Sequence, residues 1–156
     1  MKELLDQKHT MNSTNTNAGG WKDSGMRTWL NARVYNGLPD QWKLLVQMVN
    51  VASSIGNQSY EISTANDYIW IPSNKEVGFS TTTTPYSNEA EGTINYFTSN
   101  ASRIKKLDNG KGNANIWWLR SPNINYSYTF GIVLTTGEGN AGSANISSGV
   151  CFGFCI

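Results

Sequence analysis

The chain has 156 residues, which is the size of a single domain with one hydrophobic core. Its 12 Lys and Arg residues balance 11 Asp and Glu residues, and charged residues make up only 15% of the total. This balance gives no electrostatic basis for binding nucleic acid or an acidic membrane surface. No stretch approaches the roughly 20 apolar residues of a membrane-spanning helix, so we expect no insertion into a bilayer. Residues 1–10 lack the apolar run of a secretory signal, which suggests the cut edge of a longer protein.

Residues 12–34 predict an ordered loop followed by a helix. Residues 12–21 are mostly turn formers whose short side chains bond neighbouring backbone groups, and Trp21 is expected to fix this loop to the core. Ser24 suits the cap of a helix. The apolar positions of this helix follow helical spacing: Met26, Trp29, Leu30 and Val34.

A second helix is predicted from Pro39, whose missing N–H is tolerated in a first helical turn, to Gly56, which is expected to stop it. Apolar residues line two of its faces, so we expect it to be buried on both sides. One face holds Trp42, Leu45, Val46 and Val49, and the other holds Leu44, Met48 and Val51.

The middle of the chain offers weaker signals. Residues 57–66 are polar, residues 68–71 form a short apolar strand, and residues 76–79 suit one helical turn. The stretch 80–91, with four consecutive threonines, predicts an excursion at the surface. The remaining feature is a basic cluster that we interpret as a solvated face: Arg103, Lys105, Lys106 and Lys111.

The C-terminal stretch has rigid flanks. The apolar run 116–119, closed by Ser121 and Pro122, predicts a buried strand. The last eight residues, GVCFGFCI, alternate as a strand does, and we expect the N-terminal segment to pair with them. One face of this last strand would hold Val150, Phe152, Phe154 and Ile156.

The two cysteines, Cys151 and Cys155, lie four residues apart on that predicted strand, so their Cα atoms should be about 13 Å apart. A disulfide needs them within about 7 Å, and we therefore predict none. The single histidine, His9, has no Cys, His or acidic cluster at ligand spacing around it. We accordingly expect no metal site, no catalytic residue and no cofactor.

Residues 123–148 have an unusual composition. They contain one charged side chain, Glu138, and no Lys, Arg, Gln, Met or Trp. Tyr, Ser, Gly and Asn, which are enriched in antibody contact loops, supply much of this segment. A polar segment between two core strands is the layout of a binding surface on a scaffold. The alternative is a glycine-rich loop that merely connects strands.

Five motifs together resemble an uncharacterised family of modules found in proteins of gut bacteria and their phages: MNSTNTNAGGW at 11–21, SGMRTWLN at 24–31, YIWIPSNKEV at 68–77, IWWLRSP at 116–122 and the terminal GVCFGFCI. The order of WWLRSP, a strand and a glycine-led last strand is also similar to the C-type lectin fold. That resemblance implies a single α+β domain over residues 1–156, in which two helices flank a small twisted antiparallel sheet and the termini pair.

Within this group the chain resembles the variable proteins of diversity-generating retroelements. In such systems the last segment of the gene is rewritten at adenines, so AAC or AAT codons never become Lys, Glu, Gln, Met or Trp. Residues 123–148 obey this restriction except at Glu138, which would be a fixed position. The resemblance implies a ligand-binding surface of exchanged, solvent-facing side chains, with Phe130 and Val133 pointing inward. The expected surface residues are Ile124, Asn125, Tyr126, Tyr128, Thr129, Ile132, Leu134, Asn140, Ala141, Asn145, Ile146 and Ser147.

The implied partner is a protein or glycan on a cell surface, and the implied location is extracellular, on a phage virion or a bacterial cell surface. Sugar-binding lectins of this fold build a calcium site from paired acidic ligands that are absent from the nearest matches, Leu38-Pro-Asp40 and Ser121-Pro-Asn123. Two alternatives stay open. One is an invariant structural module of a phage tail or bacterial surface protein. The other is an enzyme of the formylglycine-generating type, which acts through a C-terminal cysteine pair spaced one residue differently from Cys151 and Cys155.

Overall fold

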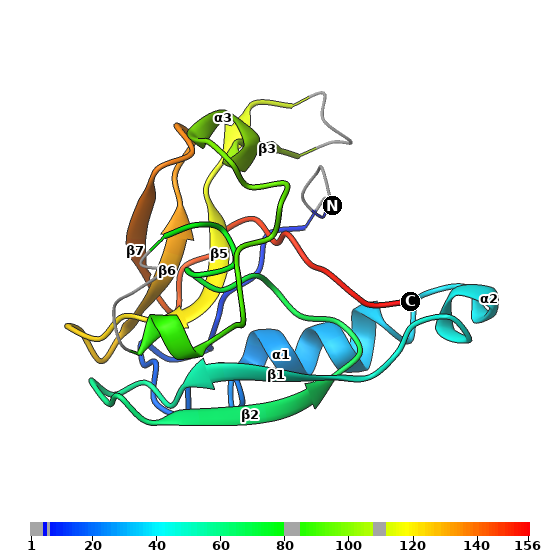
Figure 1. Cartoon of the computed structure of the whole chain (residues 1–156), viewed down its shortest axis with the longest axis horizontal. Coiled ribbons are helices and arrows are strands. Elements are labelled where there is room, and N and C mark those ends of the chain that lie inside the picture. The colour runs from blue at the N-terminus through cyan, green and yellow to red at the C-terminus, as the bar shows by residue number, and fades with distance from the viewer. Residues whose placement is uncertain (1–4, 6, 80–84, 108–111) are drawn as a thin grey trace.

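The computed structural model describes residues 5, 7–79, 85–107 and 112–156, which form short helices and antiparallel strands. This arrangement confirms the α+β class. Figure 1 shows an upright three-stranded sheet standing beside a long two-stranded ribbon, with the first helix lying along that ribbon. The upright sheet has the order β5 (Trp117–Pro122), β6 (Thr129–Val133), β7 (Gly139–Ser143). The ribbon pairs β1 (Val49–Ser54) with β2 (Ile62–Asp67), and the smallest sheet pairs β3 (Lys105–Lys106) with β4 (Ala114–Asn115).

Strand β5 is buried on both faces, as the apolar run at its start indicates, and the burial extends to Arg120 and Ser121. Trp118 points into the larger core cluster, which includes Phe130 and Ile132 of β6. Trp117 and Leu119 point into a smaller cluster on the opposite face. Strands β5 and β6 are therefore interior strands, and the polar loop that joins them starts from fixed positions.

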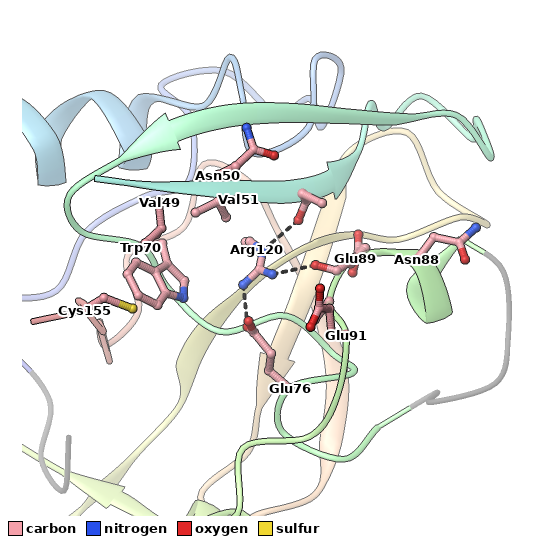
Figure 2. A pocket seen from close by; sticks show the side chains of 12 residues that line it. Val49, Asn50, Val51, Trp70, Glu76, Asn88, Glu89, Glu91, Arg120 and Cys155 are labelled. Atoms are coloured by element: carbon pink, nitrogen blue, oxygen red, sulfur yellow. Dashed lines mark hydrogen bonds and ion pairs between the residues drawn. The ribbon is translucent and has the colours of Figure 1, made fainter. Parts of the chain in front are cut away.

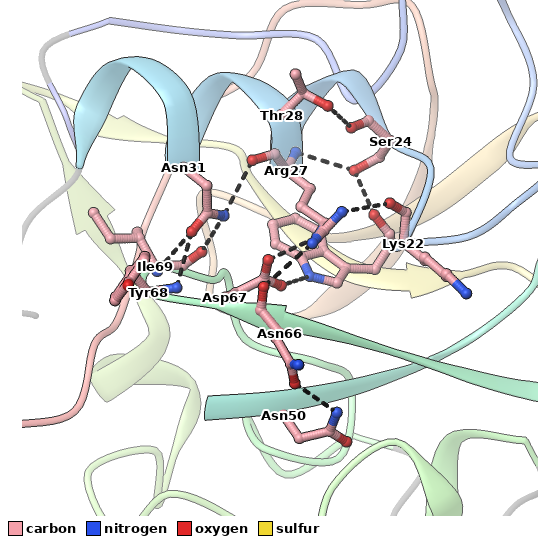
Figure 3. Close-up of polar contacts among 11 residues, drawn as sticks. Lys22, Ser24, Arg27, Thr28, Asn31, Asn50, Asn66, Asp67, Tyr68 and Ile69 are labelled. Carbon is pink, nitrogen blue, oxygen red and sulfur yellow. Dashed lines mark hydrogen bonds and ion pairs between the residues drawn. The ribbon is translucent and has the colours of Figure 1, made fainter. Parts of the chain in front are cut away.

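Helix α1 (Gly25–Trp29) begins as predicted, because the side chain of Ser24 accepts a hydrogen bond from the backbone N–H of Arg27. It continues as the π-helical turn η1 (Leu30–Val34). Figure 3 shows the polar contacts that attach this helix to β2. The Arg27 Nε atom donates to Oδ1 of the buried Asp67 at 2.6 Å, and Trp21 Nε1 donates to Oδ2 at 2.7 Å. The predicted role of Trp21 as a core anchor is confirmed, with Asp67 as its partner.

The strand expected at residues 68–71 is not formed. The carboxamide oxygen of Asn31 accepts hydrogen bonds from the backbone N–H groups of Tyr68 and Ile69, at 2.9 and 3.2 Å (Figure 3). These two donors are therefore unavailable to a sheet, and this stretch keeps one isolated bridge, between Trp70 and Gly153. The side chain of Asn31 thus accepts the hydrogen bonds that a neighbouring strand would otherwise accept.

The predicted helix from Pro39 to Gly56 is wrong. Helix α2 spans only Asp40–Lys43, and the chain then becomes β1. Valines are stiff at χ1 and fit a pleated strand better than a helix, and the partner strand β2 decides the outcome. The polar stretch 57–66 contains most of that partner strand, with a hairpin turn at Gly56 (φ 71°) joining the two.

The N-terminal segment pairs with the last segment, as expected. The backbone N–H of Leu5 donates to the carbonyl of Val150 at 2.9 Å, and His9 bridges Ser148. However, residues 150–156 form isolated bridges rather than a continuous alternating strand. Ile156, expected on the core face, is 73% exposed.

Two further expectations about the surface are wrong. In the basic cluster, Arg103 and Lys105 are buried, and the Lys105 ammonium lies 4.2 Å from the ring centre of Tyr96. Lys106 is exposed, and Lys111 lies outside the described residues.

In the expected surface excursion 80–91, residues 80–84 are not described, and the turn η2 (Tyr86–Asn88) carries Tyr86 into the interior. Residues 76–79 belong to a hydrogen-bonded turn, without becoming a helix.

Candidate functional site

The structure separates the twelve expected surface residues into three groups. Seven are exposed: Asn125, Tyr126, Tyr128, Asn140, Asn145, Ile146 and Ser147. Ile124, Leu134 and Ala141 are half-buried, whereas Thr129 and Ile132 are buried.

Six of the exposed residues lie at one end of the molecule, and we call them the tyrosine surface: Asn125, Tyr126, Tyr128, Asn145, Ile146 and Ser147. Tyr126 and Tyr128 are 52% and 41% exposed, and their ring centres are 5.8 Å apart. The backbone N–H of Ala144 donates to the carbonyl of Tyr128 at 2.9 Å, which holds the turn 144–147 next to the loop 123–128. The result is an uncharged surface of aromatic, aliphatic and carboxamide side chains.

The fully buried Asn17 anchors the tyrosine surface from beneath. Its side-chain nitrogen donates to the carbonyls of Tyr126 and Thr129, both at 2.8 Å, and more weakly to that of Asn123 at 3.3 Å. Its side-chain oxygen accepts from the backbone N–H of Asn57 at 2.7 Å. One carboxamide therefore joins the loop after β5 to the β1–β2 hairpin, and this fixes the backbone that carries the two tyrosines.

Replacing Asn17 by Ala is expected to lower the free energy of unfolding by about 2 kcal/mol, because buried carbonyl groups lose their donor. The expected local effect is faster amide hydrogen exchange at Asn57 and within residues 123–129, measured by mass spectrometry. Asn15, an exposed residue of the same loop, provides the matched control. Equal exchange in the Asn17→Ala and Asn15→Ala variants would contradict the anchoring role.

Sequence reasoning missed two neighbouring elements that contribute to this end of the molecule. From η2, the hydroxyl of Tyr86 accepts a hydrogen bond from the backbone N–H of Ile124 at 3.0 Å. From the β1–β2 hairpin, Gln58 Nε2 donates to the carbonyl of Asn125 at 3.3 Å. These contacts join residues that are 38 and 67 positions apart, so no local pattern signals them.

Thr129 and Ile132 were expected to face solvent because Phe130 and Val133 were assigned to the interior. The inward assignment of Phe130 and Val133 is correct, but every residue of β6 is buried. Ile132 is 5% exposed and packs in the same core cluster as Trp118. Ile132 is therefore a core residue and offers no exposed side chain to a partner.

Asn140 and Ala141 lie apart from the tyrosine surface, on the edge strand β7, where they pair with Ile132 and Gly131. Asn140 borders an open, mostly polar cavity of about 510 Å³. Asn140 is therefore separate from the two exposed tyrosines. Asn123, at the start of their loop, lines the same cavity as Asn140.

A second cavity, of about 460 Å³, lies beside β1 and contains a buried charge network (Figure 2). Arg120 is at the centre of this network and pairs with Glu76. Its guanidinium also donates to the backbone carbonyls of Ala52, Ile71 and Glu89, at 2.8, 3.0 and 2.7 Å. Because the guanidinium bonds four acceptors that all belong to the protein, we assign Arg120 a structural role.

Glu89 is the other buried charge-bearing residue of this network. One carboxylate oxygen accepts from the backbone N–H of Ser54 at 3.1 Å, and the other from the Ser121 hydroxyl. Burial raises the pKa of Glu89 to about 7, against the opposing effects of the Ser121 hydrogen bond and the Arg120 charge. The carboxyl group therefore changes its protonation state near neutral pH.

The two cysteines do not converge on this cavity. Cys155 is exposed and lines it, whereas Cys151 is buried and lines a separate cavity of about 170 Å³. This arrangement lends no support to the cysteine-pair enzyme.

Within the described ranges, no group of three or more His, Cys, Asp or Glu residues is placed to hold a metal ion. The described helices include none with the length and apolar character needed to cross a membrane.

A family model described as "Domain of unknown function (DUF6273)" matches residues 1–156. No curated protein and no solved structure shows a significant match.

Proposed function

We propose that this chain, which belongs to the family described as a domain of unknown function (DUF6273), is a ligand-binding module that recognises a protein or glycan on a cell surface through the tyrosine surface. One observation carries the proposal. Tyr126 and Tyr128 lie beside Asn145 and Ile146, which come from a different turn, and all four side chains are exposed. An uncharged cluster of this kind on a fixed backbone suits reversible recognition.

Binding by this surface is non-covalent. The two tyrosines supply large, stiff contact area, and the carboxamides of Asn125 and Asn145 satisfy polar groups of the partner. Because Asn17 and Tyr86 already hold the loop backbone, little conformational entropy is lost when a ligand binds. The surface needs no charge, metal or cofactor for this task.

The proposal includes a C-type lectin-like scaffold whose surface residues a retroelement exchanges, displayed outside the cell on a virion or bacterial surface. A small antiparallel sheet and the pairing of the N-terminal segment with residues 148–150 support such a scaffold. One helical stretch, α1 with η1, lies along the ribbon, and the second flanking helix is reduced to the single turn of α2. The composition of residues 123–148 supports the exchange.

Sequencing the gene from independent isolates tests this function. We expect substitutions to cluster at the codons of the tyrosine surface and to spare the buried Thr129, Phe130 and Ile132, because most changes at buried positions would destabilise the sheet. Glu138 should stay fixed, and a near-copy of the segment should lie beside a reverse transcriptase gene. Substitutions spread evenly over the segment, or none at all, would favour an invariant structural module.

A further inference from the structure

An exposed apolar lobe lies at the opposite end of the molecule from the tyrosine surface (Figure 1). It consists of α2, the residues that follow it and the chain end. Val46 is buried and attaches the lobe to the body, whereas its neighbours face outward, with Leu44 87% exposed. The exposed apolar residues of the lobe are Trp42, Leu44, Leu45, Met48 and Ile156.

The chain end belongs to the lobe because two contacts join it to α2 and to the residues that follow α2. The backbone N–H of Gln47 donates to the carbonyl of Cys155 at 2.9 Å, which brings Ile156 beside Met48 and its neighbours. The ring of Phe154 meets the ring of Trp42 edge to face, with centres 6.3 Å apart. The apolar side chains therefore form one region and are not scattered over the surface.

We infer that a second copy of this chain covers the apolar lobe, forming a twofold dimer. The five side chains expose on the order of 600 Å², comparable with the roughly 800 Å² per partner of a standard interface and at the upper end of what monomers leave open. The two charged side chains of α2 offset each other, since Lys43 pairs with Asp40 at 2.8 Å. These two side chains therefore add no net repulsion between two copies, and a self-complementary patch closes by a twofold axis.

The position of the lobe has a consequence for recognition. A dimer formed there leaves both tyrosine surfaces free at its outer ends, as the opposite placement of the two regions in Figure 1 indicates. Two linked sites strengthen attachment to a target that carries many copies of a ligand. This consequence rests on the proposed function, whereas the dimer itself does not.

Sedimentation equilibrium of the full chain over a micromolar concentration range tests the dimer without any ligand. We expect twice the 17.2 kDa mass of one chain. Leu44→Glu combined with Met48→Glu should raise the dimer dissociation constant at least about 100-fold, because it places like charges in the interface. Ile146→Glu on the tyrosine surface, a residue about as exposed as Met48, should leave the mass unchanged.

Other outcomes overturn the inference. A wild-type chain that stays monomeric at all concentrations would exclude the dimer, and open-ended larger assemblies would exclude the twofold arrangement. A dimer that Ile146→Glu dissociates and the double variant does not would move the interface to the other end. Circular dichroism of each variant separates dissociation from unfolding. None of these results depends on whether the tyrosine surface binds a ligand.

Discussion

Replacing Arg120 by Met is expected to lower the free energy of unfolding by about 3–5 kcal/mol, the largest effect among the changes considered for this protein. Arg120 is 2% exposed and supplies donors to backbone carbonyls of three separate segments, at Ala52, Ile71 and Glu89. Met fills much of the same volume but donates nothing. The variant therefore leaves three carbonyls and the carboxylate of Glu76 without their shared partner.

Urea unfolding followed by tryptophan fluorescence measures this loss, with Arg33→Met as the control because Arg33 is exposed. The control should change stability by less than about 0.5 kcal/mol. Adding Glu76→Gln to Arg120→Met should restore part of the stability, since the double variant no longer holds an unpaired carboxylate. A loss below about 1 kcal/mol for Arg120→Met would show that the network contributes little to the fold.

The sequence predicted those features that local chemistry determines. Ser24 caps α1 because a hydroxyl three residues before a free backbone N–H is sufficient. The apolar residues Trp117, Trp118 and Leu119 predicted a buried strand, and they lie in the buried strand β5. The exposure of Tyr126 and Tyr128 was expected from the resemblance to variable proteins rather than from local chemistry, and both side chains are exposed.

Features that depend on distant partners could not be predicted in the same way. The helical spacing of residues 42–51 was misleading because β2, a polar stretch, provides the pairing that turns residues 49–54 into a strand. Arg120 and Glu89 look like surface charges until segments far apart in the sequence supply their hydrogen-bond partners. The anchoring role of Asn17 cannot be predicted for the same reason, since the carbonyl groups to which its side chain donates lie more than 100 residues away.

The stability of this protein is expected to fall by about 3 kcal/mol as the pH rises from about 4.5 to 7, through the titration of Glu89. Burial raises the pKa of Glu89 to about 7 in the folded state, above its usual value of 4.5. Between these two values the folded chain binds one proton more than the unfolded chain. The stabilising contribution is therefore complete below pH 4.5 and is lost as the pH rises through 7, which is opposite to the effect of an exposed, salt-bridged carboxylate.

Glu89→Gln isolates this contribution, because a carboxamide resembles the protonated acid and does not titrate. It can still accept from the backbone N–H of Ser54 and bond the hydroxyl of Ser121. Urea unfolding at several pH values should give a stability difference between variant and wild type that grows by about 3 kcal/mol, in favour of the variant, from pH 4.5 to 8. Glu91→Gln, two residues away and exposed, removes a carboxyl group outside the buried network and serves as the control. If both variants gave parallel curves, Glu89 would be ionised throughout, and the charge of Arg120 would outweigh the burial of the carboxylate.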